Sequence, residues 1–60
     1  GVADILGVSS SGRFVAIEVK SKRGKTSKAQ DRFLQAVSEK GGKAFVARSI
    51  GCVEKELQDV

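Results

Sequence analysis

Residues Gly1–Lys20 read GVADILGVSSSGRFVAIEVK, and this stretch decides the fold. Two apolar-rich runs, Ala3–Val8 and Arg13–Lys20, flank a Ser/Gly cluster, which predicts a β-hairpin with a longer loop. The second run is rich in β-branched and aromatic residues and is the strongest strand candidate in the chain. Each run also carries an acid, Asp4 or Glu18, where a plain core strand would have none.

The spacing of these acids predicts that they meet across the hairpin. If the turn is centred near Ser11, the numbers of paired residues sum to about 22, so Asp4 lies opposite Glu18, and Lys20 follows on the same face. Opposed side chains in an antiparallel pair lie about 4.5–5.5 Å apart at Cβ. Two carboxylates this close repel each other, and a divalent cation with hard oxygen ligands, such as Mg²⁺, would offset the repulsion. A lysine beside them can orient the attacking water or stabilise charge on a phosphate, so the pattern favours phosphodiester hydrolysis.

A structural explanation of the same residues stays open at this stage. A Glu-x-Lys on a strand is common and usually marks a solvated face with a cross-strand ion pair. Asp4 alone is more often a turn or strand-edge residue than a ligand. A one-residue slip in the register would also send Asp4 to the opposite face of the sheet.

The rest of the chain predicts a crossover and a final helix. A basic loop, Ser21–Ser27, precedes a helix over about Lys28–Lys40, and Ser27 with Gln30 fits a capping box. Gly41-Gly42 predicts a left-handed stop.

Lys43–Arg48 is apolar on both faces and reads as a buried strand parallel to the second strand. A last helix is expected over about Ile50–Asp59, capped by Ser49 and packing through Val53, Leu57 and Val60. The three phenylalanines and Cys52 are expected in the core. The order β-β-α-β-α gives an α/β fold with one mixed sheet and helices against it.

Length and composition bound the class of protein. Sixty residues form one domain with a thin core, and 40% hydrophobic with 30% charged residues is ordinary for a soluble protein. The single cysteine cannot form an internal disulfide, and with no histidine a zinc site is not expected. Uncharged stretches are too short for a membrane span. We expect a reducing, intracellular setting and no membrane partner; bacterial cytoplasm, nucleus and a viral or phage origin stay open.

The charge of the chain is uneven. Its net charge is +4, and six of the eleven basic residues fall within thirteen positions: Lys20, Lys22, Arg23, Lys25, Lys28 and Arg32. This asymmetry favours a polyanionic partner. We expect Lys22, Arg23, Lys25 and Lys28 to contact a nucleic-acid backbone, which gives affinity without sequence specificity. The alternative is a solvated loop that keeps a small protein soluble.

The order and spacing of four sequence blocks, with the turn and the basic loop between them, resemble a known family. DILG, a short turn, RFVAIEVK, a basic loop, KTSKAQDRFL and GGKAFVARS resemble the VRR-NUC family of virus-type replication-repair nucleases, within the PD-(D/E)xK superfamily of restriction-endonuclease-like folds. The resemblance covers essentially the whole chain, so it is far more specific than a lone Glu-x-Lys. It implies a restriction-endonuclease-like mixed β-sheet with flanking helices.

The resemblance also implies a role for each matching residue. Asp4 is the acid of the first motif, Glu18 and Lys20 are the Glu-x-Lys pair, the backbone carbonyl of Val19 is a further metal ligand, and Gln30 is the glutamine opening the next helix. It implies Mg²⁺ or Mn²⁺ as cofactor. Family members carry an N-terminal helix with a glutamate and another strand before the aspartate, so residues 1–60 are expected to be one N-terminally truncated domain.

Three functions stay in competition. The first is a divalent-metal-dependent DNA endonuclease; relatives act on structured DNA such as junctions or flaps, and a homodimer would suit two-fold symmetric junctions. The second is a catalytically inactive nucleic-acid-binding module of the same fold. The third is a structural fragment that needs a partner chain, suggested by the thin core.

Overall fold

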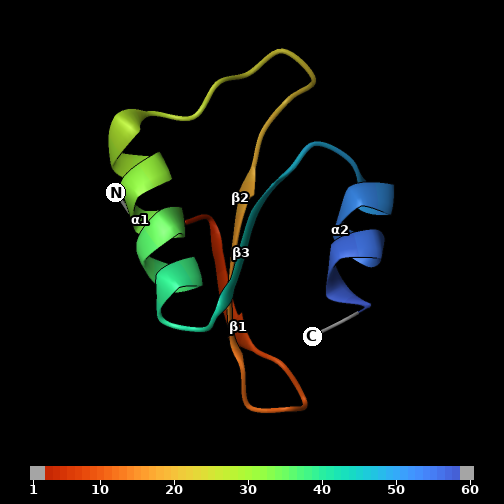
Figure 1. Cartoon of the computed structure of the whole chain (residues 1–60). Helices are drawn as coiled ribbons and strands as arrows, with labels where there is room; N and C mark the ends of the chain where they lie inside the picture. The colour runs from red at the N-terminus through yellow and green to blue at the C-terminus, as the bar shows by residue number, and fades with distance from the viewer. Residues whose placement is uncertain (1–2, 59–60) are drawn as a thin grey trace.

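The computed structural model describes residues 3–58 as a mixed α/β unit, with a sheet between two helices. Its elements follow the predicted order: β1 (Ile5–Val8), β2 (Phe14–Val19), α1 (Lys28–Glu39), β3 (Lys43–Ala47) and α2 (Ile50–Leu57). The described strands form one sheet in the order β1-β2-β3, and the two helices lie on opposite sides of it (Figure 1). The predicted β-β-α-β-α order is therefore confirmed.

The hairpin has the predicted register. Ile5 pairs with Ile17 and Val8 with Phe14, so paired numbers sum to 22. The turn is closed by Ser9, whose backbone N–H donates to the Arg13 carbonyl at 2.8 Å. Gly12 in this turn has φ +84°, a left-handed conformation that glycine adopts without strain.

The first strand is shorter than predicted, because β1 begins at Ile5 and not at Ala3. Asp4 lies in a bend just before the strand, and its Oδ2 accepts a hydrogen bond from the backbone N–H of Val19 at 2.9 Å. The Val19 N–H, which would otherwise donate to a backbone carbonyl and extend the β1–β2 pairing, donates to this carboxylate instead. The pairing of β1 with β2 therefore ends at Ile5.

The third strand runs parallel to β2, as the crossover predicted, with Val15 beside Lys43 and Val19 beside Ala47. Its predicted full burial is wrong. β3 is the edge of the described sheet, and apart from Ala47 its residues are only half-buried. β2 is the central strand and holds the deepest positions, because among the described strands it alone has a neighbour on each side.

The helix α1 has the predicted start and stop. Ser27 and Gln30 form the capping box, with the Ser27 Oγ accepting from the Gln30 N–H and the Gln30 Oε1 accepting from the Ser27 N–H. The helix ends before Gly41, which has φ +90°. Gly42 is needed for packing: a Cβ there would lie 2.6 Å from Val37 Cγ1 and 2.9 Å from the Phe14 carbonyl oxygen.

The helix α2 closes the other face of the sheet. Its cap is Ser49, whose Oγ accepts from the Cys52 N–H at 3.1 Å. Cys52 and Val53 are partly buried against the core cluster of Val15, Ile17 and Ala47. α2 ends at Leu57, which stays partly exposed, and the predicted contact through Val60 lies outside the described residues.

The sheet has two distinct ends, visible in Figure 1. At the loop end, β2 leads into the basic loop (residues 21–27) and β3 leads into α2. At the turn end lie the Ser9–Gly12 turn and the Gly41-Gly42 connection. Phe14 begins β2 at the turn end and is 41% exposed, so its predicted place in the core is wrong: it borders an open apolar groove beside Phe33 and Val37.

Candidate functional site

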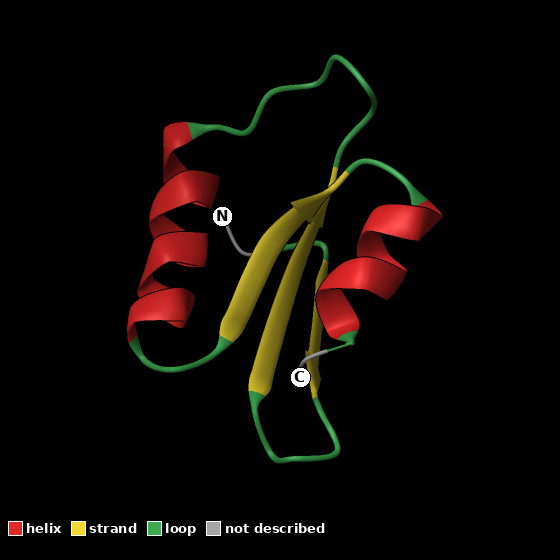
Figure 2. Ribbon diagram, turned by 45° about the vertical axis from the view of Figure 1, so that its right-hand side comes forward, coloured by secondary structure: helices red, strands yellow, loops and turns green. Residues whose placement is uncertain are grey.

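The predicted site residues gather at the loop end of the sheet, on the α1 face. Alternation along β2 sends Val15 and Ile17 toward α2, so Ala16 and Glu18 point toward α1. The N-terminus of α1 lies at the same end, because the helix runs back antiparallel to β2 (Figure 2). The Glu18 carboxylate and the first turn of α1 therefore both lie at the loop end of the sheet, on the same face.

Glu18 is the most unusual residue of the site. It is 1% exposed and is the largest fully buried side chain among the described residues. Its Oε1 has no hydrogen-bond partner in the described part of the chain. A buried carboxylate oxygen without a partner is costly, and native structures retain few of them.

Asp4 lies beside Glu18. Residues 4 and 18 continue the pairing register of the hairpin, and the Asp4 Oδ2 contact with the Val19 N–H holds the aspartate at this position. The pKa of Glu18 is raised above its ordinary value of 4.5, mainly because burial disfavours the charged form. Hydrogen bonding with Asp4 and the charge of Asp4 raise this pKa further. The two carboxyls therefore act on each other, as the sequence spacing predicted.

Lys20 lies next to this pair. Its positive charge lowers the pKa of Glu18 and so opposes the effect of Asp4. The side chain is half-buried, and the backbone N–H donates to the Ala47 carbonyl at 3.0 Å. The end of β3 thus anchors the residue at which β2 enters the basic loop.

Val19 contributes through its backbone. Its N–H points at Asp4, and in an extended strand the N–H and C=O of one residue face the same neighbour. The Val19 carbonyl therefore faces the side on which Asp4 lies. Its side chain points to the α2 face, away from Glu18, and is half exposed.

Gln30 is engaged in the capping box. Its Oε1 accepts from the Ser27 N–H at 2.8 Å, so in this arrangement the side chain stabilises the start of α1. It lies at the loop end with the site but has no hydrogen bond to Asp4, Glu18 or Lys20 among those the described residues form. The capping explanation is confirmed, and a catalytic role stays a prediction.

The basic loop presents its charges to solvent. Lys22, Arg23 and Lys25 of the loop are exposed, as is Lys28 at the start of α1. A turn within the loop is closed by the Gly24 N–H donating to the Ser21 carbonyl at 3.2 Å. The four residues lie at the same end of the molecule as the carboxylates.

Sequence reasoning missed Arg48. Its Nη1 donates to two carbonyl oxygens of the basic loop, Ser21 at 2.7 Å and Gly24 at 2.6 Å. Its position in the sequence could have indicated this contact. Arg48 directly follows a strand predicted to run parallel to β2, so it should lie beside the loop that follows β2. A count of charges could not separate it from a solvated arginine.

The donor set fits a hard divalent cation. Asp4 and Glu18 supply carboxylate oxygens, one of them without a partner in the part of the chain that the structure describes, and the Val19 carbonyl faces the same side. Mg²⁺ is commonly held by one or two carboxylates and keeps its remaining positions for water and phosphate. No group of three or more acidic, histidine or cysteine side chains gathers within the described residues. The site therefore suits a cation that shares its coordination with a substrate.

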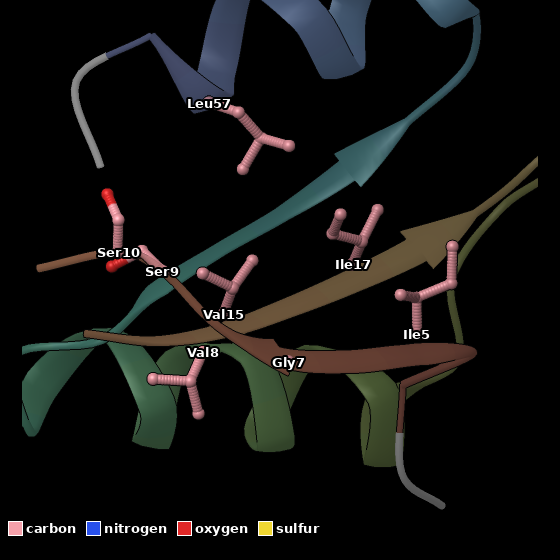
Figure 3. A pocket seen from close by; sticks show the side chains of 8 residues that line it. All are labelled: Ile5, Gly7, Val8, Ser9, Ser10, Val15, Ile17 and Leu57. Carbon is pink, nitrogen blue, oxygen red and sulfur yellow. The ribbon is translucent and has the colours of Figure 1, made fainter. Parts of the chain in front are cut away.

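An apolar groove of about 400 Å³ lies elsewhere, between β1, β2 and the end of α2 (Figure 3). Ile5, Val15 and Ile17 point into it from the α2 face, with Leu57 opposite. Among the described residues, no acidic or basic side chain lines it. It is separated from Glu18 by the sheet, so it contributes nothing to the carboxylate site.

One comparison with known proteins gave a match. The model of the VRR-NUC domain family matches residues 1–50, a range that includes every site residue named above. Comparisons with curated proteins and with solved structures gave no match. In the described part of the chain, no helix is long and apolar enough to cross a membrane.

Proposed function

The chain belongs to the VRR-NUC domain family, a family of nuclease domains, and from this premise we propose that it is a divalent-metal-dependent DNA endonuclease. We place its active site at the loop end of the sheet, with Asp4, Glu18, Lys20 and the Val19 carbonyl as its central groups. Residues 1–60 then act as one nuclease domain or as part of one. Structured DNA such as junctions or flaps, and a homodimer acting on two-fold symmetric junctions, are the finer parts of this proposal.

One observation carries the proposal: a fully buried glutamate oxygen that has no partner among residues 3–58, next to a second carboxylate. A purely structural strand gains nothing from this arrangement, because both burial and the neighbouring Asp4 disfavour the charged form. Mg²⁺ or Mn²⁺ would give the oxygen its missing partner and offset the repulsion between the acids. The cost in the cation-free state is what a preorganised site is expected to show.

Each residue has a separate task. Asp4 and Glu18 hold the cation, and the Asp4 contact with the Val19 N–H keeps the two acids in register. A bound divalent cation supplies positive charge to the scissile phosphate and makes water a better nucleophile. Lys20 orients the attacking water or stabilises the phosphate charge. Gln30 lies at the helix start, where backbone N–H groups favour a phosphate.

The basic residues would hold the rest of the DNA. Lys22, Arg23, Lys25 and Lys28 are exposed beside the site and would neutralise backbone phosphates on either side of the scissile bond. Such contacts position the duplex without reading its sequence. Binding is therefore expected to weaken steeply with salt.

The test is cleavage of DNA by the full-length protein with Mg²⁺ or Mn²⁺. Asp4→Ala, Glu18→Ala and Lys20→Ala should each lower kcat by at least about 10²-fold, because each removes charge stabilisation in the transition state. Glu56→Gln is the matched control, since Glu56 lies on α2 and pairs with Lys43 at the turn end. Its cleavage rate should equal that of the wild type.

Two results would contradict the proposal. Undiminished cleavage in the three alanine variants would remove the assigned site. Salt-sensitive DNA binding with no effect of the cation on binding or cleavage would favour the alternative, a catalytically inactive nucleic-acid-binding module of the same fold. The exposed basic loop alone is consistent with that alternative, so the cation dependence is the deciding measurement.

A further inference from the structure

We propose that Arg48 is a positioning residue that holds the basic loop in the conformation needed to contact DNA phosphates. This inference rests on the proposed function, because it assigns a task to the loop beside the nuclease site. It concerns a residue to which the family resemblance assigned no role. Arg48 would act through the loop and would not contact the DNA itself.

The contacts of Arg48 show that its side chain is already engaged. One nitrogen, Nη1, donates to the Ser21 carbonyl at 2.7 Å and to the Gly24 carbonyl at 2.6 Å. Hydrogen bonds from a charged donor are shorter and stronger than neutral ones. A guanidinium group committed to two carbonyl oxygens is a poor direct partner for a phosphate.

The two carbonyls mark the base of a turn that carries two of the predicted phosphate contacts. Ser21 and Gly24 are joined by their own backbone hydrogen bond at 3.2 Å, and Lys22 and Arg23 lie between them. Both of these side chains are exposed. Arg48 therefore fixes the base of the turn while its tip projects into solvent.

The position of Arg48 explains why it can do this. It directly follows Ala47, whose carbonyl receives the Lys20 N–H at 3.0 Å. The end of β3 thus makes two contacts with the chain that leaves β2. The Ala47 carbonyl binds the Lys20 N–H, and the Arg48 side chain binds the turn at residues 21–24. The basic loop and the carboxylate site are tied to the same strand end.

The turn end offers a matched control. Arg13 makes the same kind of clamp there, donating from Nε to the Gly41 carbonyl at 2.8 Å and from Nη2 to the Gly42 carbonyl at 3.3 Å. Arg13→Met and Arg48→Met each remove one positive charge and one pair of hydrogen bonds from a guanidinium group to backbone carbonyls, which we call a clamp. Only Arg48→Met should affect the basic loop, because only that clamp lies beside the site.

The first measurement is tryptic digestion of the full-length protein without DNA, following cleavage at Lys22, Arg23 and Lys25 by fragment mass. Arg48→Met should speed cleavage in the loop by about five-fold or more, since local opening controls proteolysis of a folded chain. Arg13→Met should leave the loop rate unchanged. This measurement does not depend on nuclease activity, so it separates failure of the clamp from failure of the proposed function.

The second measurement is the salt dependence of DNA binding and the kinetics of cleavage. Each phosphate contact contributes about 0.9 to the slope of log K against log salt, so losing the loop contacts should lower the slope by more than one contact, up to about 2.7 for three. KM should rise while kcat stays near the wild-type value, because the carboxylates are untouched.

Three outcomes would overturn the inference. They are an unchanged rate of loop digestion, equal effects of Arg13→Met and Arg48→Met, and a slope lowered by only about 0.9, which would indicate one direct phosphate contact by Arg48. If Arg48→Met does not fold, Arg48→Lys replaces it. That variant keeps the charge but has a shorter side chain with a different donor geometry, so a clamp would still be weakened while a simple charge effect would not change.

Discussion

A glutamate lies near each end of the sheet, and the surroundings of the two residues shift their pKa values in opposite directions. At the turn end, Glu56 of α2 forms an ion pair with Lys43 at 2.8 Å, and this pairing lowers the pKa of Glu56. At the loop end, Glu18 is buried, its Oε1 has no partner among the described residues, and its pKa is raised. The same residue type is thus stabilised as an anion at one end and destabilised at the other.

The two ends also use their arginines differently. Arg13 holds the Gly41-Gly42 connection, where α1 turns back into the sheet and Gly42 is tightly packed. Arg48 holds a loop that carries exposed basic side chains. The turn end has an ion pair and a closely packed glycine, Gly42, which serve stability, beside the open groove that Phe14 borders. The loop end has a carboxylate oxygen with no partner among the described residues and several exposed basic side chains, which cost stability and suit a bound cation and a polyanion.

The largest effect on stability is expected at the turn end. A Cβ on Gly42 would meet Val37 Cγ1 at 2.6 Å and two backbone oxygens, Phe14 O at 2.9 Å and Val37 O at 3.1 Å, which cannot move freely. Gly42→Ala should therefore lower the free energy of unfolding by about 1–3 kcal/mol, as overpacking does. Urea denaturation measures this change.

The control for this substitution lies at the loop end. A Cβ on Gly24 would meet Ser21 Oγ at 3.0 Å, and a serine hydroxyl can rotate away. Gly24→Ala should change the free energy of unfolding by less than about 0.5 kcal/mol. If Gly24→Ala lowered the free energy of unfolding more than Gly42→Ala does, the close packing would not be at Gly42.

An intermediate effect of opposite sign is expected from Glu18→Gln. Because the folded pKa of Glu18 lies above 4.5, its stabilising contribution is complete below that pH and is lost as the pH rises through the folded pKa. Without divalent cations, Glu18→Gln should thus match the wild type near pH 4 and melt at a temperature several degrees higher at neutral pH. Thermal unfolding across this range measures the difference.

The same variant tests the cation. Mg²⁺ or Mn²⁺ should raise the melting temperature of the wild type, because a ligand that binds only the folded state stabilises it. Glu18→Gln should lose most of this increase. An equal increase in both proteins would show that the cation binds elsewhere, and a variant less stable at neutral pH would contradict the cost assigned to the buried carboxylate.

The smallest effect is expected from Glu56→Gln. The folded pKa of Glu56 lies below 4.5, so its contribution is present above that pH and is lost as the pH falls through the folded pKa. The variant should be slightly less stable than the wild type at neutral pH and equal to it in acid. The effect is small because both side chains of the pair are partly exposed. A pH dependence with the same sign as that of Glu18→Gln would remove the contrast between the two ends.

Much of the fold was predictable because its signals are local. The Ser/Gly cluster and the alternation on either side of it predicted the hairpin and its register, which the structure confirms through the Ile5–Ile17 pair. Ser27, Gln30 and Ser49 predicted the helix starts, and each side chain makes its expected capping contact. Such contacts span only a few residues, so their partners can be read from spacing alone.

Other features depend on partners that are distant in the sequence. The half-burial of β3 follows from its place at the edge of the described sheet, and the exposure of Phe14 follows from its place at the end of β2, beside an open groove. The sequence of a short segment does not show which other segments will pack against it. Apolar content alone therefore overestimated the burial of Phe14 and of β3. The two arginine clamps join residues 24 to 29 positions apart, which no local pattern indicates.

The sequence by itself determined the order of elements, the pairing of Asp4 with Glu18 across the hairpin, and membership of a nuclease family. These follow from residue period, turn chemistry and motif spacing, all of which are properties of the chain. Only the tertiary structure decided that Glu18 is the most deeply buried of the described charged residues, that its Oε1 lacks a described partner, and that Arg48 holds the basic loop. Burial and long-range hydrogen bonds exist only after the sheet has assembled, because they depend on how β2, β3 and both helices surround each side chain.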